Sequence, residues 1–291
     1  MKSVFGVWSI VLVLCLSATG LSIRYIALHS IPLSESLVVR GFVCLAMVVG
    51  WARYRSLSLR PKFVKTQIVR AAIAGLALSF FSMSYNWLSA SSVAMLSNID
   101  VPMLVILGSL VGQASSLKTK LLSLLSIVLL VIYGSHVQHE PQWVLGLATL
   151  GLGLFLLCFG YYFIKKSMNE ENRAITVLTP AVAIIVYGGL QKFTEVSSLG
   201  TWDLTILMVT VISAVGMFGA YYATMKLYAL TDIAMAEFPT LLSSLAIQPL
   251  EYLLFNEPLM PSQFFLSFLF VGCTYLILNS EKSNVEAVHA S

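Results

Sequence analysis

In two stretches that are otherwise apolar, an acidic residue lies two positions before a proline. Residues 97–107 read SNIDVPMLVIL, with Asp100 before Pro102, and a second stretch reads AEFPTLLSSL, with Glu237 before Pro239. An ionised aspartate at the centre of a bilayer costs about 2.5–3.5 kcal/mol, so such a side chain should face other helices or a wet cavity. There it can bind an amine group of a solute or carry a coupling proton. The alternative is a structural tether between helices.

The two prolines have a consequence of their own. Pro102 and Pro239 each lack a backbone donor and free a carbonyl one turn earlier in a helix. In a membrane that carbonyl must find another partner or line a cavity. Both prolines are therefore candidate helix kinks, with either a structural role or a role beside a solute site.

A lone arginine is the third chemical candidate. Arg40 stands about one and a half turns into the second apolar stretch. Three interpretations are open: its side chain extends to the membrane surface, it pairs with Glu35, or it meets an anionic group of a solute. Glu237 is a comparable case, because it could pair with Lys226 near the inner surface instead of binding a solute.

Polar and aromatic side chains flank the same stretches. Asn98, Tyr85 and Tyr222 suit a cavity for a small polar or zwitterionic solute, although each alone is also typical of contacts between helices. Gln248 and Glu251 lie further outward on the predicted ninth helix, where an outer gate would sit. The candidate residues for substrate binding or coupling are Asp100, Glu237, Asn98, Tyr85, Tyr222 and Arg40.

The composition indicates which kind of structure holds these residues in place. The chain has 291 residues, of which 58% are hydrophobic and 10% charged, and its mean hydropathy is +0.88. A soluble domain carries about 25% charged residues, so the outer surface of this chain must face lipid. We expect an all-α integral membrane protein with ten transmembrane helices, at residues 4–26, 35–52, 68–88, 91–111, 121–137, 142–164, 175–193, 204–228, 233–255 and 263–280.

The basic residues predict the orientation. With both termini cytoplasmic, fourteen of the 17 basic residues fall on the inner side, which satisfies the positive-inside rule. Only Arg24, Arg40 and Lys192 are left for the outer half. The chain has no N-x-S/T sequon, which favours a bacterial inner (cytoplasmic) membrane as the location of this multi-pass protein.

The two halves of the chain contain similar segments. LSASSVAMLSNIDVP (88–102) is similar to YALTDIAMAEFP (228–239), and their shared Ala-Met pairs are 140 residues apart. We therefore expect two five-helix repeats, 1–140 and 141–280, followed by a short cytoplasmic tail at 281–291. Because five is odd, the repeats insert with opposite orientation, as in many secondary transporters, and the site is expected between them.

Three segments carry a resemblance to a known family: ESLVVRGFVCLAM around Arg40, YYATMKLYALTDIAMAEFP, and LLFNEPLMPSQFFLSFLFVG. They resemble the EamA-type ten-helix permeases of the drug/metabolite transporter (DMT) superfamily, although Asn256 replaces the family's usual glycine. The resemblance implies a solute carrier with a central cavity near the fourth and ninth helices. It also implies a substrate among amino acids, metabolites or drugs.

The function expected is that of a secondary transporter (permease) of a small polar or zwitterionic metabolite, such as an amino acid or an amine or sulfonium compound. Two alternatives are open: an intramembrane lipid-modifying enzyme, or an exporter of drug-like or apolar compounds in the same fold. The chain lacks a P-loop, an HExxH pair and clustered acids, so we expect no enzyme activity, no catalytic residues, no metal and no cofactor. Expected partners are the solute, coupling protons or ions, and the lipid bilayer. Nucleic acid is not expected, and a homodimer stays open.

Overall fold

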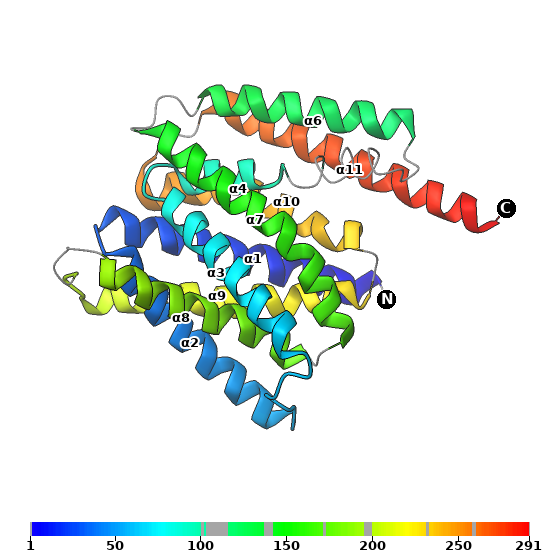
Figure 1. The fold of residues 1–291 in the computed structure, drawn as a ribbon. Coiled ribbons are helices and arrows are strands. Elements are labelled where there is room, and N and C mark those ends of the chain that lie inside the picture. Colours follow the sequence, from blue (N-terminus) through cyan, green and yellow to red (C-terminus); the bar gives the residue numbers. More distant parts are fainter. Residues whose placement is uncertain are drawn as a thin grey trace.

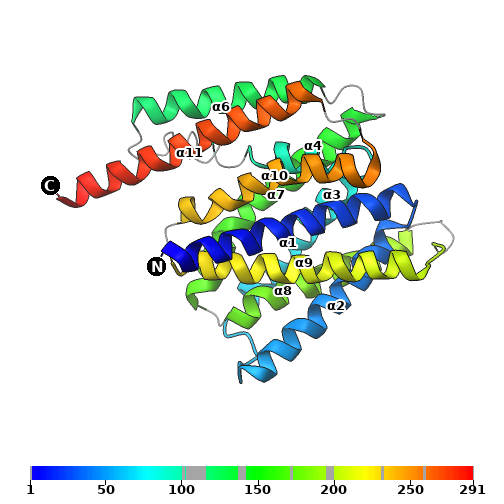
Figure 2. The same cartoon turned by 180° about the vertical axis from the view of Figure 1, so that it is seen from behind.

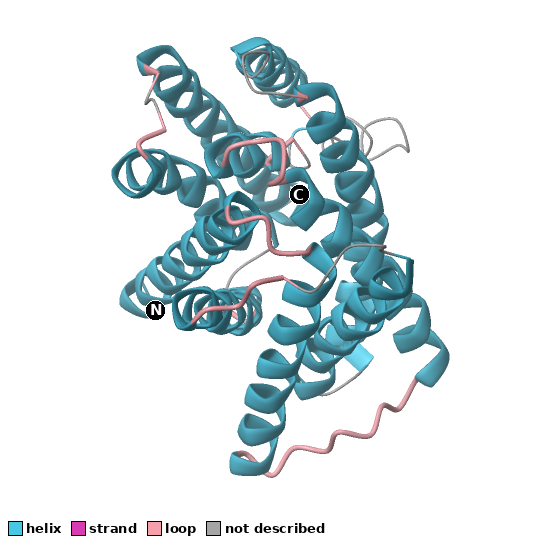
Figure 3. Cartoon of the chain, turned by 90° about the vertical axis from the view of Figure 1, so that its left-hand side faces the viewer, coloured by secondary structure: helices cyan, strands magenta, loops and turns pink. Residues whose placement is uncertain are grey.

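In the computed structural model, helices joined by turns and loops make up the part of the chain that is described. The described residues are 2–99, 102, 116–136, 142–170, 173–194, 200–230, 233–257 and 260–290. They form ten helices and contain no strand. Figure 3 accordingly shows helices connected by loops. The prediction of an all-α protein is therefore confirmed for these residues.

The helix bounds follow the predicted ranges closely, except in the fourth helix and in the last, which was expected to end at 280 and continues to Ala290. Six of the helices are long and apolar enough to cross a membrane, and α7 and α11 contain shorter apolar segments. The helices are α1 (Lys2–Leu28), α2 (Leu33–Tyr54), α3 (Val64–Ser84), α4 (Ala90–Ser97), α6 (Leu117–His136), α7 (Trp143–Glu170), α8 (Arg173–Thr194), α9 (Leu204–Tyr228), α10 (Ile233–Phe255) and α11 (Pro261–Ala290).

The fourth predicted helix, 91–111, is not continuous. α4 begins after Ser89, whose side chain accepts a hydrogen bond from the Ser92 amide, and it ends at Ser97. Asn98 is its C-terminal cap, and a turn follows at residues 98–99. The Asn98 side chain donates a hydrogen bond back to the backbone oxygen of Ala94, and Pro102 has no amide that could bond the carbonyl of residue 98 in a continuing helix. Hydropathy alone missed this break because the residues on both sides are apolar.

The large apolar side chains lie on the outside of the bundle as well as in its core. On α1, for example, Val7, Ile10 and Leu14 are exposed while Leu12 is buried. A helix that is apolar all round needs an apolar environment on both sides. This pattern is what an all-α membrane protein requires, since lipid covers the outer apolar surface.

The helices divide into a main group and an outlying pair. α1 packs along α9, α2 along α8 and α3 along α7, and these six helices form the main body. α6 packs along α11, and this pair lies apart from the main body in both views of the ribbon (Figures 1 and 2). α4 and α10 contact each other and lie between the pair and the body (Figures 1 and 2). α10 also packs along α1, so it links the two groups.

Small residues allow the closest of these contacts. A Cβ atom at Gly216 of α9 would lie 2.8 Å from the backbone oxygen of Cys15 in α1. A Cβ atom at Gly188 of α8 would lie 2.8 Å from the backbone oxygen of Ser34 in α2. Close approach through small residues is the usual way in which membrane helices associate, because lipid provides no hydrophobic drive between them.

Candidate functional site

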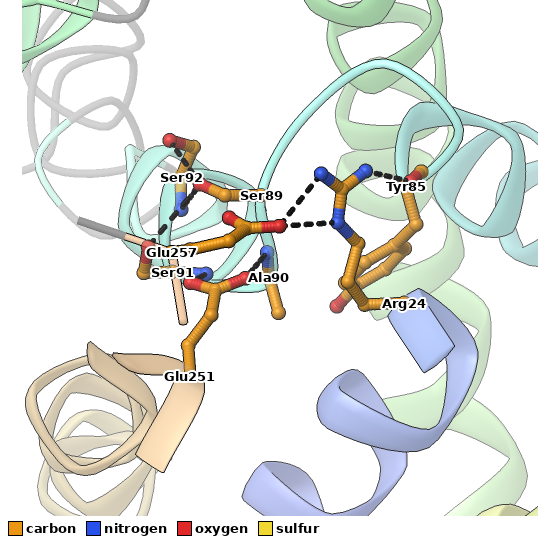
Figure 4. A network of polar contacts seen from close by, with 8 residues as sticks. All are labelled: Arg24, Tyr85, Ser89, Ala90, Ser91, Ser92, Glu251 and Glu257. Carbon is orange, nitrogen blue, oxygen red and sulfur yellow. Dashed lines mark hydrogen bonds and ion pairs between the residues drawn. The ribbon is translucent and has the colours of Figure 1, made fainter. Parts of the chain in front are cut away.

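One end of the bundle is held by an arginine of α1. Near the C-terminal end of α1, Arg24 donates hydrogen bonds from Nε and Nη2 to Oε1 of Glu257, at 3.1 and 2.8 Å. Its Nη1 donates to the backbone oxygen of Tyr85 at 2.8 Å. Figure 4 shows this arrangement, in which one guanidinium joins the segment after α10 to the segment after α3.

A glutamate of α10 binds the start of α4 in the same region. Glu251 is almost fully buried, and its two carboxylate oxygens accept hydrogen bonds from the backbone amides of Ala90 and Ser91 (Figure 4). A carboxylate is stabilised at a helix N-terminus, because the first amides of a helix have no partner within it and carry partial positive charge. Glu251 therefore ties α10 to α4 across more than half of the sequence.

A second glutamate collects donors from the connection between α8 and α9. Glu35, near the start of α2, accepts from Nζ of Lys192 at 2.7 Å and from Nε1 of Trp202 at 2.7 Å. It also accepts from the backbone amide of Gly200. The interpretation that Arg40 pairs with Glu35 is therefore wrong. The two residues lie five positions apart on α2, about 140° apart around the helix axis, so their side chains point to different neighbours.

Arg40 itself is buried and has no acidic partner among the described residues. Its side chain is 3% exposed, and Nη2 donates to Oγ of Ser82 on α3 at 2.9 Å. Its Nε has no hydrogen-bond partner within the described part of the chain. Of the three cations expected on this half, Arg24 and Lys192 each have a glutamate, whereas Arg40 has only a hydroxyl among the described residues. The interpretation that Arg40 extends to the membrane surface is thus wrong as well.

Tyr85 follows three residues after Ser82, the hydrogen-bond partner of Arg40. It is buried just after the end of α3. A Cβ atom at Gly20 of α1 would lie 3.2 Å from the phenol oxygen and 3.5 Å from Cδ1 of Ile247 in α10. Arg40 therefore contacts the end of α3 through Ser82, and the Tyr85 phenol lies beside α1 near Ile247 of α10.

The other candidates lie elsewhere. Asn98 is buried at the end of α4, where its Nδ2 donates to the backbone oxygen of Ala94. Pro102 and Pro239 are both buried, and Pro239 lies within the continuous helix α10. Asp100 lies outside the described residues.

Glu237 belongs to α10 by its backbone, but its side chain is outside the described part. The prediction that the two acids face a shared site stays a prediction.

Tyr222 is part of an aromatic cluster toward the C-terminal end of α9. Its ring packs edge-on against Trp8 and Trp51, with ring centroids 5.4 and 5.3 Å apart. The ammonium group of Lys226 lies 5.4 Å from the centroid of the Tyr222 ring, within the range of a cation–π contact. Tyr222 thus lies far along the bundle from Arg40, in a contact between α1, α2 and α9.

The residues that sequence reasoning missed are the partners of the charges. Arg24 and Glu257 were not expected to pair, because they lie 233 positions apart in the chain. Glu251 was expected only in an outer gate, without a partner. One feature of the sequence could have indicated these contacts. Arg24, Glu251 and Glu257 lie in or next to apolar stretches, where an ionised group needs a partner.

Comparisons with known proteins support the fold, but they indicate neither a family nor a function. No protein-family model matches the chain, and no curated protein matches it. One solved structure, described only as the crystal structure of a protein, is similar with a TM-score of 0.68 and 10% sequence identity. The match covers 96% of this chain and 98% of the other. The helical arrangement is therefore one that an experimental structure also adopts.

Proposed function

We propose that the protein is a secondary transporter of a small polar or zwitterionic metabolite, which works by alternating access between two inverted repeats. The first repeat holds α1 to α6 and the second holds α7 to α11. Secondary transporters of this kind expose one central site to each side of the membrane in turn. In this proposal the solute binds where helices of the two repeats meet.

The pairing of the helices is the observation that carries the proposal. In two equivalent repeats, α1, α2, α3, α4 and α6 of the first correspond in this order to α7, α8, α9, α10 and α11 of the second. Each helix is now exchanged with its counterpart. The contact of α1 with α9 then becomes the contact of α7 with α3, and both are extensive. The contact of α3 with α8 becomes that of α9 with α2, and the pairs α2 with α8, α4 with α10 and α6 with α11 map onto themselves. The contact of α1 with α10 departs from this exchange, since its counterpart between α7 and α4 is slight. The symmetry of the other pairs supports two equivalent halves, which can exchange roles at similar energy.

The sequence motifs that resemble EamA-type permeases of the DMT superfamily are a second support. In the proposed orientation both termini are cytoplasmic, within a bacterial inner membrane, and the C-terminal end of α1 is external. The contacts of Arg24 with Glu257 and of Glu251 with α4 then close the outer end of the bundle (Figure 4). Opening toward the outside would require these contacts to separate.

A reconstitution experiment tests the proposal. The purified protein is placed in proteoliposomes, and metabolites that raise its melting temperature are assayed for flux under an imposed pH gradient. We expect accumulation of at least one zwitterionic or amine metabolite. Asp100→Asn and Glu237→Gln are expected to lower this flux or shift its pH dependence, since both remove a carboxylate that can bind an amine or a proton.

The matched control is Lys118→Gln, which removes a charge at an exposed position of α6. Its flux should equal that of the parent protein. If the proteoliposomes accumulate no metabolite beyond protein-free vesicles, the transporter proposal is wrong. If flux is present but neither acid variant changes it, the proposed coupling residues are wrong.

A further inference from the structure

No acid among the described residues pairs with the charge on Arg40. Arginine keeps its charge in proteins, and an unpaired charge inside a low-dielectric region is costly. Arg24 and Lys192, at the same end of the bundle, each have a glutamate within 2.8 Å. The guanidinium of Arg40 is more deeply buried than either, yet the described residues offer it only the hydroxyl of Ser82.

The depth of Arg40 removes the ordinary explanation for an arginine in a membrane helix. Arg40 is the eighth residue of α2, about 10 Å from its start along the helix axis. An arginine near a membrane surface normally extends its head group to water. Here the side chain instead turns toward Ser82 on α3, and the residue is 97% buried.

The groups around Arg40 fit one kind of ligand. A guanidinium presents its donors in a planar fork that matches a carboxylate, which accepts two parallel hydrogen bonds. Its Nε has no partner among the described residues, and Ser82 adds a hydroxyl group 2.9 Å from Nη2. One positive charge balances one carboxylate, whereas a phosphate monoester carries up to two negative charges and would leave an excess.

We propose that the guanidinium of Arg40, with the hydroxyl group of Ser82, binds the carboxylate of the transported solute. This inference rests on the proposed function and narrows it: the solute must carry a carboxylate, so amines and amides without one are not substrates. The guanidinium is buried in the described conformation. A solute therefore reaches it only after the bundle opens, as alternating access requires.

The first test concerns the protein without ligand. Because no acid among the described residues contacts Arg40, Arg40→Gln is expected to leave the melting temperature in detergent equal to that of the parent protein or above it. Arg24→Gln serves as the comparison and should lower the melting temperature, since it leaves Glu257 without its partner. If Arg40→Gln lowers the melting temperature and Asp100→Asn or Glu237→Gln cancels this loss, a protein acid is the partner and the inference is overturned.

The second test measures binding with defined probes. Pools of the protein amino acids, of the corresponding amino acid amides, and inorganic phosphate are each added at millimolar concentration to the purified full-length protein. We expect the amino acids to raise the melting temperature and the amides and phosphate to leave it unchanged. Arg40→Gln should weaken this binding by about tenfold or more, because a charge-assisted hydrogen bond is lost.

Arg40→Lys gives a second variant that keeps the charge and loses the fork. It should bind the amino acids more weakly than the parent protein and more tightly than Arg40→Gln. Equal stabilisation by amides and amino acids, stabilisation by phosphate alone, or no stabilisation by the amino acids would each overturn the inference. Flux of a solute without a carboxylate would overturn it while leaving the transporter proposal intact, and absence of any flux would refute the transporter proposal instead.

Discussion

Gly188→Val is expected to destabilise the protein by about 1–3 kcal/mol, whereas Gly189→Val is expected to leave its stability unchanged or slightly increased. The two glycines are neighbours on α8, so both substitutions change helix propensity by the same amount. They differ in what the new side chain meets. The pair therefore isolates the packing between α8 and α2.

The environment of each glycine explains the difference. A Cβ atom at Gly188 would lie 2.8 Å from the backbone oxygen of Ser34, 2.9 Å from Cβ of Leu37 and 3.0 Å from Cγ2 of Val38. A backbone atom cannot rotate away as a flexible side chain can, so α2 and α8 must move apart. A Cβ atom at Gly189 would meet nothing within 4 Å.

Thermal unfolding in detergent measures the effect. A loss of about 1–3 kcal/mol corresponds to a fall in melting temperature of about 2–10 °C for a chain of this size. Movement of α2 also shifts Arg40, so Gly188→Val should weaken any binding that depends on that residue. Equal melting temperatures for the two variants would show that α2 and α8 do not pack this closely.

Glu251→Ala is expected to loosen the first turn of α4. The substitution leaves the backbone amides of Ala90 and Ser91 without the carboxylate that accepts from them. A buried donor without a partner costs about 1–3 kcal/mol, so the expected loss of stability is of that order or larger. Glu251→Gln should be milder, because its amide oxygen can still accept one of the two hydrogen bonds.

Hydrogen exchange followed by mass spectrometry measures this change locally. Peptides that cover α4 should exchange faster in Glu251→Ala, while peptides of α8 and α9 should exchange as in the parent protein. Glu257→Ala is the matched control, since it breaks the ion pair with Arg24 and leaves the amides of α4 bound. If Glu257→Ala loosens α4 as much as Glu251→Ala does, the tie to Glu251 is not what holds that helix.

Hydropathy predicted most helices within a few residues of their observed ends. A helix that faces lipid must be apolar along its whole length, so the signal is strong and local. The prediction of the fourth helix was wrong because hydropathy reports only how apolar a segment is. The break after Ser97 depends on backbone geometry at Asn98, and the apolar residues around it look alike in a helix or a turn.

The candidate site was harder to predict because its contacts join distant parts of the chain. The acceptor of Lys192 is Glu35, 157 positions away, and the donors to Glu251 lie 160 and 161 positions away. Glu35 is near Arg40 in the sequence, but it is the wrong partner. With 3.6 residues per helical turn, two residues five positions apart point in different directions. Only the packing of α2 against α3 and α8 determines which neighbour each side chain meets.

The sequence by itself determined that the chain is a helical membrane protein and where nearly all of its helices lie, because the bilayer requires long apolar segments with satisfied backbone groups. It also showed that Arg40 is an unusual residue for such a segment. The tertiary structure decided which charges are balanced: Arg24 and Lys192 have glutamates, and Arg40 is buried beside Ser82 without one among the described residues. Charge balance depends on distances between helices, and these distances exist only in the folded bundle.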